Sequence, residues 1–157
     1  MNRYINPAAD LNCGSGDDLQ LDWAGVEGAH ALPLSAAQLG IWFAAQLDAC
    51  PFAYNIGEYI EIDGPIDPAL FEQALRQIVS ETETLRVRIT ERAGQPHQVV
   101  GDPPTFSLPL IDVSTETDAR AAAEAWMRVD LAQPFAPMQG PLFAFALFKA
   151  SPARFFW

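Results

Sequence analysis

Histidine and cysteine are the side chains best suited to nucleophilic, acid–base or metal chemistry, and the sequence has two of each: His30, His97, Cys13 and Cys50. A catalytic histidine needs a partner that orients it, and no pattern around either histidine supplies one. His97 falls in a predicted hairpin and His30 just before the first predicted helix, so we expect solvated or core-edge imidazoles. The two cysteines could pair, but two thiols without a dense cysteine framework favour reduced side chains.

Other chemistry-bearing motifs are missing from the sequence. It has no glycine-rich phosphate loop, no Cys/His cluster with metal-ligand spacing and no Gly-x-Ser-x-Gly elbow. Glu58 falls on the apolar side of an alternating stretch, which is typical of a sheet-edge position or of a paired carboxylate. Taken alone, the residues therefore predict almost no catalytic set, and no metal or bound cofactor.

Composition narrows the class of protein. The chain has 157 residues, of which 50% are hydrophobic and 18% charged, as in a globular domain with a real core. The net charge is −11 with only nine Lys plus Arg, which argues against binding to nucleic acid or to an anionic membrane. No apolar run approaches the roughly 20 residues of a membrane span, and no secretory signal precedes the body. We therefore expect a cytoplasmic protein.

The chain divides near residue 30. Residues 1–30 are acidic, glycine-containing and without a sustained period, which predicts a flexible acidic leader. Leu19, Leu21 and Trp23 in this leader are either a short docking segment for a partner or a segment that packs on the domain. Residues 31–157 carry the periodic patterns of a folded body.

Two helices are predicted with clear starts. Ser35 and Gln38 form a capping box, with an apolar stripe of Leu39, Trp42, Phe43 and Leu47 behind it. Asp67-Pro68 begins the second helix, and its apolar face contains Leu70, Phe71, Ala74, Leu75, Ile78 and Val79. A third helix is predicted from Ser114 or Thr115, with a stripe of Ala122, Ala125, Trp126 and Val129.

Strands are predicted around these helices. Residues 54–62 alternate, with Tyr54, Ile56, Ile60 and Ile62 on the buried side; residues 85–90 and 97–100 form a hairpin, and residues 106–113 are extended. Residues 142–148 are apolar without alternation, as in a fully buried central strand, and residues 154–157 form its partner. The fold class is therefore mixed α/β (α+β), with helices packed on a mixed, largely antiparallel sheet.

The first helix start also resembles a family signature. Ser35, Ala37, Gln38 and Trp42 match Ser-x-Ala-Gln-x-Arg-(Leu/Met)-Trp, the first motif of nonribosomal peptide synthetase condensation domains. Gly40 stands where that family usually has Arg. The implied fold is a lobe of the chloramphenicol-acetyltransferase-like type.

A second motif follows the second predicted helix. Glu83, Leu85 and Arg86 match Arg-His-Glu-x-Leu-Arg-Thr-x-Phe in register, whereas Glu81 and Thr82 depart from it. The resemblance makes Arg86 the ion-pair partner of an Asp in the active-site motif. The alternative is an ordinary surface cation on a strand.

The resemblance spans residues 32–157 and implies amide formation between two thioesters. An upstream carrier protein presents an acyl or peptidyl donor on its 4'-phosphopantetheine arm, and a downstream carrier presents the aminoacyl acceptor. The family's His-His-x-x-x-Asp-Gly motif is absent from the sequence and is expected just after Trp157. We therefore expect the 157 residues to be an inactive N-terminal lobe, completed by a C-terminal lobe and an adenylation domain, of the kind found in siderophore synthetases.

Three alternatives stay open. One keeps the fold and changes the chemistry to epimerisation, ester formation or cyclisation. Another is a non-catalytic module that docks a partner protein, and the last is an unrelated small globular domain.

Overall fold

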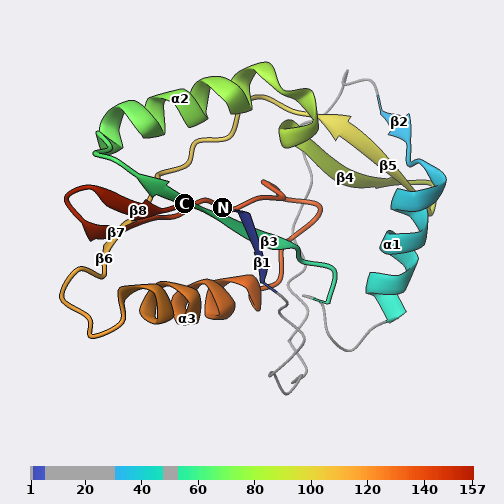
Figure 1. Ribbon diagram of the computed structural model, residues 1–157. Helices are drawn as coiled ribbons and strands as arrows, with labels where there is room; N and C mark the ends of the chain where they lie inside the picture. The colour runs from blue at the N-terminus through green and yellow to red at the C-terminus, as the bar shows by residue number, and fades with distance from the viewer. Residues whose placement is uncertain (1, 6–30, 48–52) are drawn as a thin grey trace.

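The computed structural model describes residues 2–5, 31–47 and 53–157. These residues form a five-stranded sheet of order β1-β3-β8-β7-β6 and a three-stranded sheet of order β2-β5-β4 (Figure 1). The strands are β1 (Asn2–Ile5), β2 (Leu32–Pro33), β3 (Gly57–Asp63), β4 (Val87–Arg92), β5 (Gln95–Val100), β6 (Leu110–Asp112), β7 (Leu147–Ser151) and β8 (Arg154–Phe156). The helices are α1 (Ala36–Leu47), α2 (Pro68–Glu81), α3 (Ala119–Leu131) and the short 3-10 helix η2 (Glu83–Arg86).

The predicted mixed, largely antiparallel arrangement is confirmed. Each neighbouring pair of described strands is antiparallel except β6 and β7, which run parallel. A parallel pair needs a crossover connection, and α3 lies in the segment between these two strands.

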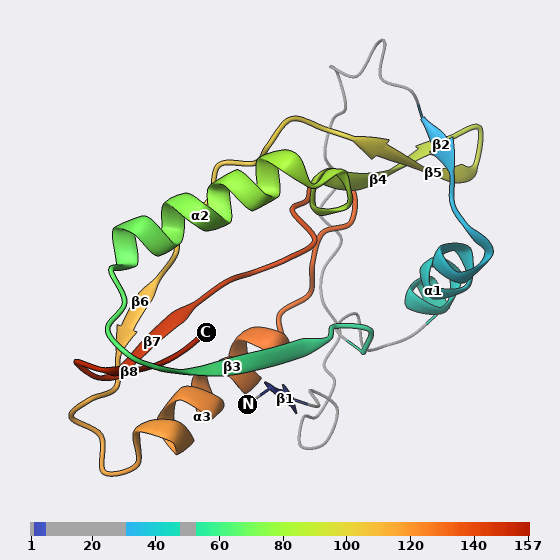
Figure 2. The ribbon, with the colours of Figure 1, turned by 45° about the horizontal axis from the view of Figure 1, so that its top comes forward.

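The larger sheet is covered on both faces. Figures 1 and 2 show α2 on one side of it and α3 on the other. Successive residues of a strand point to opposite faces, and this alternation divides the core into two clusters. One cluster contains Leu75, Leu108, Leu147 and Phe155, and the other contains Tyr59, Val113, Ala123, Phe148 and Phe156.

The predicted buried strand at 142–148 is right only at its end, because Leu147 and Phe148 are buried whereas Leu142 is 39% exposed. β7 begins only at Leu147, and it continues to Ser151, three residues beyond the predicted end. From Leu147 onward the backbone pairs with β6 on one side, and from Phe148 with β8 on the other. Residues 142–146 are apolar but none of them is fully buried, so composition predicted neither their burial nor the start of the strand.

β3 also differs from its predicted pattern. It begins at Gly57 rather than at residue 54, and Tyr59, placed on the polar side, is only 3% exposed. Ile56, placed on the apolar side, is 77% exposed because it precedes the strand. From Glu58 to Ile60 the strand alternates, but Tyr59 is on the buried side, so the predicted phase of the alternation was wrong.

Helix α2 starts as predicted. The Asp67 carboxylate accepts hydrogen bonds from Ala69 N at 2.9 Å and Leu70 N at 3.2 Å, with Pro68 in the first turn. Its buried face is narrower than the predicted stripe, because only Leu75 and Val79 are fully buried.

The predictions for α1 and α3 need correction. No residue of α1 is buried, and Leu47 at the end of its apolar stripe is 88% exposed. α3 begins at Ala119 with Asp118 as its cap, four residues beyond Ser114 and three beyond Thr115. Its packed residues are Ala119, Ala122, Ala123, Met127 and Leu131, whereas Val129 of the predicted stripe is 65% exposed.

The leader is described only in part. Residues 2–5, assigned above to the flexible leader, form β1 against β3. The rest of it, including Leu19, Leu21 and Trp23, lies outside the described residues, so the division near residue 30 stays a prediction. Within the described ranges, no helix is long and apolar enough to cross a membrane.

Candidate functional site

The first motif builds the start of α1. Gln38 N donates to Ser35 Oγ at 3.3 Å, and Ser35 N donates to Gln38 Oε1 at 2.9 Å, which confirms the capping box. Gln38 Nε2 also donates to Gln98 Oε1 at 3.2 Å, and Gln98 Nε2 donates to the carbonyl oxygen of Pro33 at 3.2 Å. Gln38 therefore joins α1 to strand β5, and Gln98 joins β5 to β2.

The remaining positions of this motif differ in their surroundings. Ala37 is exposed on α1, and Trp42 is half-buried and faces the cavity described below. A Cβ added at Gly40, the position that departs from the motif, would meet no atom within 4 Å. A larger side chain is therefore compatible with this backbone, and Gly40 is not required by packing.

The second motif forms η2 and leads into β4. Glu83 is exposed, Leu85 is half-buried, and Arg86 turns back to the end of β5. Arg86 Nη1 donates to the carbonyl oxygen of Gly101 at 2.9 Å, while Gly101 N donates to Arg86 O at 3.0 Å. The Nε of Arg86 is buried and has no hydrogen-bond acceptor among the described residues.

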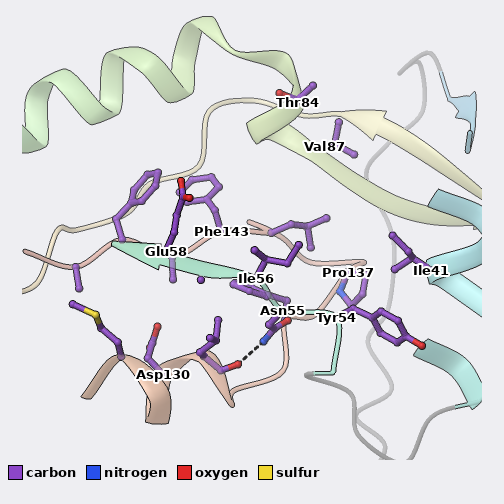
Figure 3. A pocket seen from close by; sticks show the side chains of 18 of the residues that line it. Ile41, Tyr54, Asn55, Ile56, Glu58, Thr84, Val87, Asp130, Pro137 and Phe143 are labelled. Carbon is purple, nitrogen blue, oxygen red and sulfur yellow. Dashed lines mark hydrogen bonds between the residues drawn. The ribbon is translucent and has the colours of Figure 1, made fainter. Parts of the chain in front are cut away.

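An apolar cavity of about 760 Å³ lies between the two sheets. Its walls come from α1, the segment before and at the start of β3, β4, the end of α3 and residues 142–146 (Figure 3). Ile41, Trp42, Val87 and Phe143 are among the apolar side chains that line it. The Trp of the first motif thus contributes to this wall, while Ser35 holds the helix that carries it.

Two polar residues of the cavity wall, Asn55 and Asp130, lie near the C-terminal end of α3. Asn55 Nδ2 donates to the carbonyl oxygens of Leu131 at 2.9 Å and Gln133 at 2.7 Å. Asp130 points into the same space (Figure 3), and burial raises the pKa of its carboxyl above the usual range. Glu58 is an exposed residue of β3, but β3 lies between β1 and β8, so the predicted sheet-edge position is wrong.

Among the residues that the structure describes, the other chemistry-bearing side chains form no catalytic group. His97 lies in β5, where its Nδ1 is 2.9 Å from the carbonyl oxygen of Gln95, so its predicted place in a hairpin is confirmed. His30, Cys13 and Cys50 lie outside the described residues. The described part of the chain contains no group of three or more His, Cys, Asp or Glu side chains arranged for a metal ion.

Sequence reasoning missed the main polar contacts of the larger sheet. Glu61 of β3 pairs with Arg120 of α3 and with Arg154 of β8, and the Arg154 hydrogen bond, followed by the nearby charges, lowers the pKa of Glu61. Tyr59 Oη donates to Glu124 Oε1 at 2.6 Å. The sequence does show a charged residue, Glu61, within a predicted strand. It does not show which basic residues pair with Glu61, because they lie far away in the sequence.

Comparison with known proteins identifies the family to which this sequence is similar. A family model described as the condensation domain matches residues 29–157. The chain is 50% identical to a dimodular nonribosomal peptide synthase of Bacillus subtilis over 124 residues, which cover 79% of this chain and 5% of that protein. It is 38% identical to enterobactin synthase component F of Escherichia coli over 128 residues, 80% of this chain and 10% of that protein.

Solved structures agree in both fold and sequence. The starter condensation domain of a rhizomide synthetase matches with a TM-score of 0.76 and 44% identity, over 82% of this chain and 31% of that one. The first condensation domain of the CDA synthetase matches with a TM-score of 0.76 and 32% identity, over 81% of this chain and 32% of that one. The chain thus spans about a third of these solved chains and a tenth or less of the two curated relatives. The chain belongs to the condensation domain family of nonribosomal peptide synthetases.

Proposed function

We propose that this chain is the N-terminal lobe of a condensation domain that forms an amide bond. The match of the condensation family over residues 29–157 carries this proposal. In the reaction, the amine of an aminoacyl acceptor attacks the donor thioester carbonyl. The C–N bond forms, the C–S bond breaks, and the donor carrier keeps its phosphopantetheine thiol. Holding the two substrates in this geometry supplies much of the acceleration.

The catalytic histidines belong, in this proposal, to sequence outside the 157 residues. The two histidines of the chain are not adjacent, and His97 lies in a hairpin with a backbone carbonyl beside its ring. The lobe therefore supplies a wall and its supports, and the C-terminal lobe, the adenylation domain and the two carrier proteins are its partners. The same proposal places the protein in the cytoplasm.

Arg86 has a specific part in this proposal. Its Nη1 is held by the carbonyl oxygen of Gly101, and its buried Nε lacks an acceptor among the described residues. A buried donor without an acceptor is costly, so a carboxylate from the active-site motif is a suitable partner. This arrangement supports the ion-pair role over that of an ordinary surface cation.

The donor that we propose is an acyl group rather than a peptide. A starter condensation domain 45% identical to this chain was solved in complex with C8-CoA. The similarity to enterobactin synthase component F supports the predicted place among siderophore synthetases.

The experiment supplies a donor carrier loaded with an octanoyl thioester and an acceptor carrier loaded with an aminoacyl thioester. Product is measured by mass spectrometry with the 157-residue chain and with the longer protein that contains it. We expect an amide from the longer protein and none from the chain alone. Turnover by the chain alone would show that the catalytic groups lie within it.

The same assay separates the competing functions. An ester, a cyclised product or an epimerised donor would replace amide formation by one of the related chemistries. Carrier binding without any product from the longer protein would support a docking module instead.

A further inference from the structure

Strand β1 is the outermost strand of the larger sheet on the side of β3 (Figures 1 and 2). Its four residues pair antiparallel with residues 57–60 of β3. Among the described strands, β3 would be the edge strand if β1 were removed. An edge strand presents backbone groups that can pair with another chain. Residues 2–5 therefore occupy a surface to which a different strand could bind.

Hydrogen bonds to β8 show which backbone groups of β3 face β1. Ile60 N donates to Trp157 O at 2.7 Å, and Trp157 N donates to Ile60 O at 2.9 Å. Hydrogen-bonded positions on one side of an antiparallel strand alternate with those on the other side. Because Ile60 faces β8, the peptide groups of its neighbours Tyr59 and Glu61 face the opposite side, on which β1 lies.

The register then separates the residues of β1 into two kinds. Arg3 lies opposite Tyr59, and Ile5 lies opposite Gly57. The peptide groups of Arg3 and Ile5 therefore face β3, whereas the N–H of Tyr4 between them points away from it.

The sequence of β3 can also pair with a second copy of itself. An antiparallel pair with Ile60 opposite Ile60 brings Tyr59 opposite Glu61, and both of these have their peptide groups on the β1 side. Each carboxylate of the strand then lies opposite an uncharged residue, in the pairs Glu61–Tyr59, Glu58–Ile62 and Asp63–Gly57. Like charges directly opposite each other would destabilise such a pair, and this register avoids them.

We propose that the β1 side of β3 is a strand-docking surface whose partner is β3 of a second copy, and that β1 covers it and keeps the chain monomeric. The dimer has Ile60 on its two-fold axis, and an isologous contact of this kind closes after two copies. Each copy has a net charge of −11, so added salt favours the dimer by screening the repulsion. The inference does not depend on the proposed amide formation.

The test compares the 157-residue chain with a variant that lacks residues 2–5. Mass is measured by sedimentation equilibrium over a series of protein and salt concentrations. We expect a monomer for the intact chain and a monomer–dimer equilibrium, strengthened by salt, for the shortened chain. A shortened chain that stays monomeric, an intact chain that dimerises equally, or association beyond the dimer would overturn the proposal.

Matched proline variants test whether β1 acts through its backbone. Arg3→Pro removes an N–H that faces β3, whereas Tyr4→Pro removes one that faces away, a position at which a strand tolerates proline. Arg3→Gln controls for the lost charge. We expect dimers from Arg3→Pro and monomers from the two controls. Equal dimerisation by Arg3→Pro and Tyr4→Pro would overturn the proposed pairing.

Hydrogen exchange reports on the same surface. At the lowest protein concentration, the Tyr59 amide should exchange about tenfold faster or more in the shortened chain, as expected for loss of its hydrogen bond. The Ile60 amide, which donates to Trp157 O, should keep its rate. A Tyr59 amide with the same rate in both chains would show that β1 does not cover this edge.

A substitution on the two-fold axis tests the interface of the dimer. Ile60 is 36% exposed, so the ammonium of Ile60→Lys can reach solvent in the monomer. In the dimer the two lysines would lie opposite each other, so Ile60→Lys in the shortened chain should restore the monomer. The backbone amide spectrum shows that the variant is folded, and a dimer that persists in it would place the interface elsewhere.

Discussion

Asn55 stabilises the end of α3 from a distant part of the chain. The last carbonyls of a helix have no partner within it. Asn55 Nδ2 donates to one of them, Leu131 O, and also to Gln133 O just beyond the helix. Each hydrogen bond contributes about 0.5–1.5 kcal/mol, so Asn55→Ala should lower the free energy of unfolding by about 2 kcal/mol. For a chain of this length that is a fall in Tm of about 4–8 °C.

Asn55→Asp sharpens this prediction because the two side chains have the same shape. The carboxylate cannot donate either hydrogen bond, and its negative charge meets the negative end of the helix dipole, which costs a further ~0.3–1 kcal/mol. We therefore expect the order of stability wild type, Asn55→Ala, Asn55→Asp, measured by urea denaturation at pH 7 with tryptophan fluorescence.

Two controls accompany this series. Gln73→Ala, an exposed position on α2, should change the free energy of unfolding by no more than ~0.5 kcal/mol. At a pH below the ordinary aspartate pKa of about 3.9, the carboxyl group introduced by Asn55→Asp is neutral, and the gap between the two variants should narrow. The reasoning fails if Asn55→Asp is at least as stable as Asn55→Ala at pH 7.

Three further predictions concern the sheet and the cavity wall. Because its arginine partners lower the pKa of Glu61, its stabilising effect is present above the ordinary value of 4.5 and is lost as pH falls through the folded pKa. Glu61→Gln should therefore flatten the acid limb of stability against pH, and an unchanged slope would contradict this. Burial raises the pKa of Asp130, so stability is lost as pH rises from 3.8 through the folded pKa. Asp130→Asn should raise Tm at pH 7 and have no effect well below pH 3.8, and a lower Tm at pH 7 would argue against burial as the cause. Tyr59→Phe removes the hydrogen bond to Glu124 and should cost about 1.5 kcal/mol; additive effects in a double-mutant cycle with Glu124→Gln would show that the two groups are not coupled.

Local features of the fold could be predicted from the sequence. The Ser35–Gln38 box and the Asp67 cap each depend on side chains and backbone groups within three residues. Such contacts form whatever the rest of the chain does, so their residue types identify them. The two family motifs could be located for the same reason. The first lies at the start of α1, and the second follows the end of α2.

Contacts that depend on the order of the strands could not be predicted. Glu61 and Arg154 are 93 positions apart, and Asn55 and Leu131 are 76 apart. Their pairing follows from which strand lies beside which, and composition carries no information about that. The predicted stripe of α1 erred for a related reason, because a helical period shows an apolar face without showing what covers it.

The position of β8 has a consequence for the order of folding. β8, formed by residues 154–156, lies between β3 and β7. Its neighbour β3 begins at residue 57, almost one hundred positions earlier in the sequence. Pairings across such sequence separations require a large loop to close first, which slows folding. During synthesis, β3 and α2 emerge long before Phe155 and Phe156 can join their two core clusters. We therefore expect the apolar faces of α2 and α3 to stay exposed to solvent on the ribosome until β8 has emerged. The nascent chain should be most prone to aggregation at this stage.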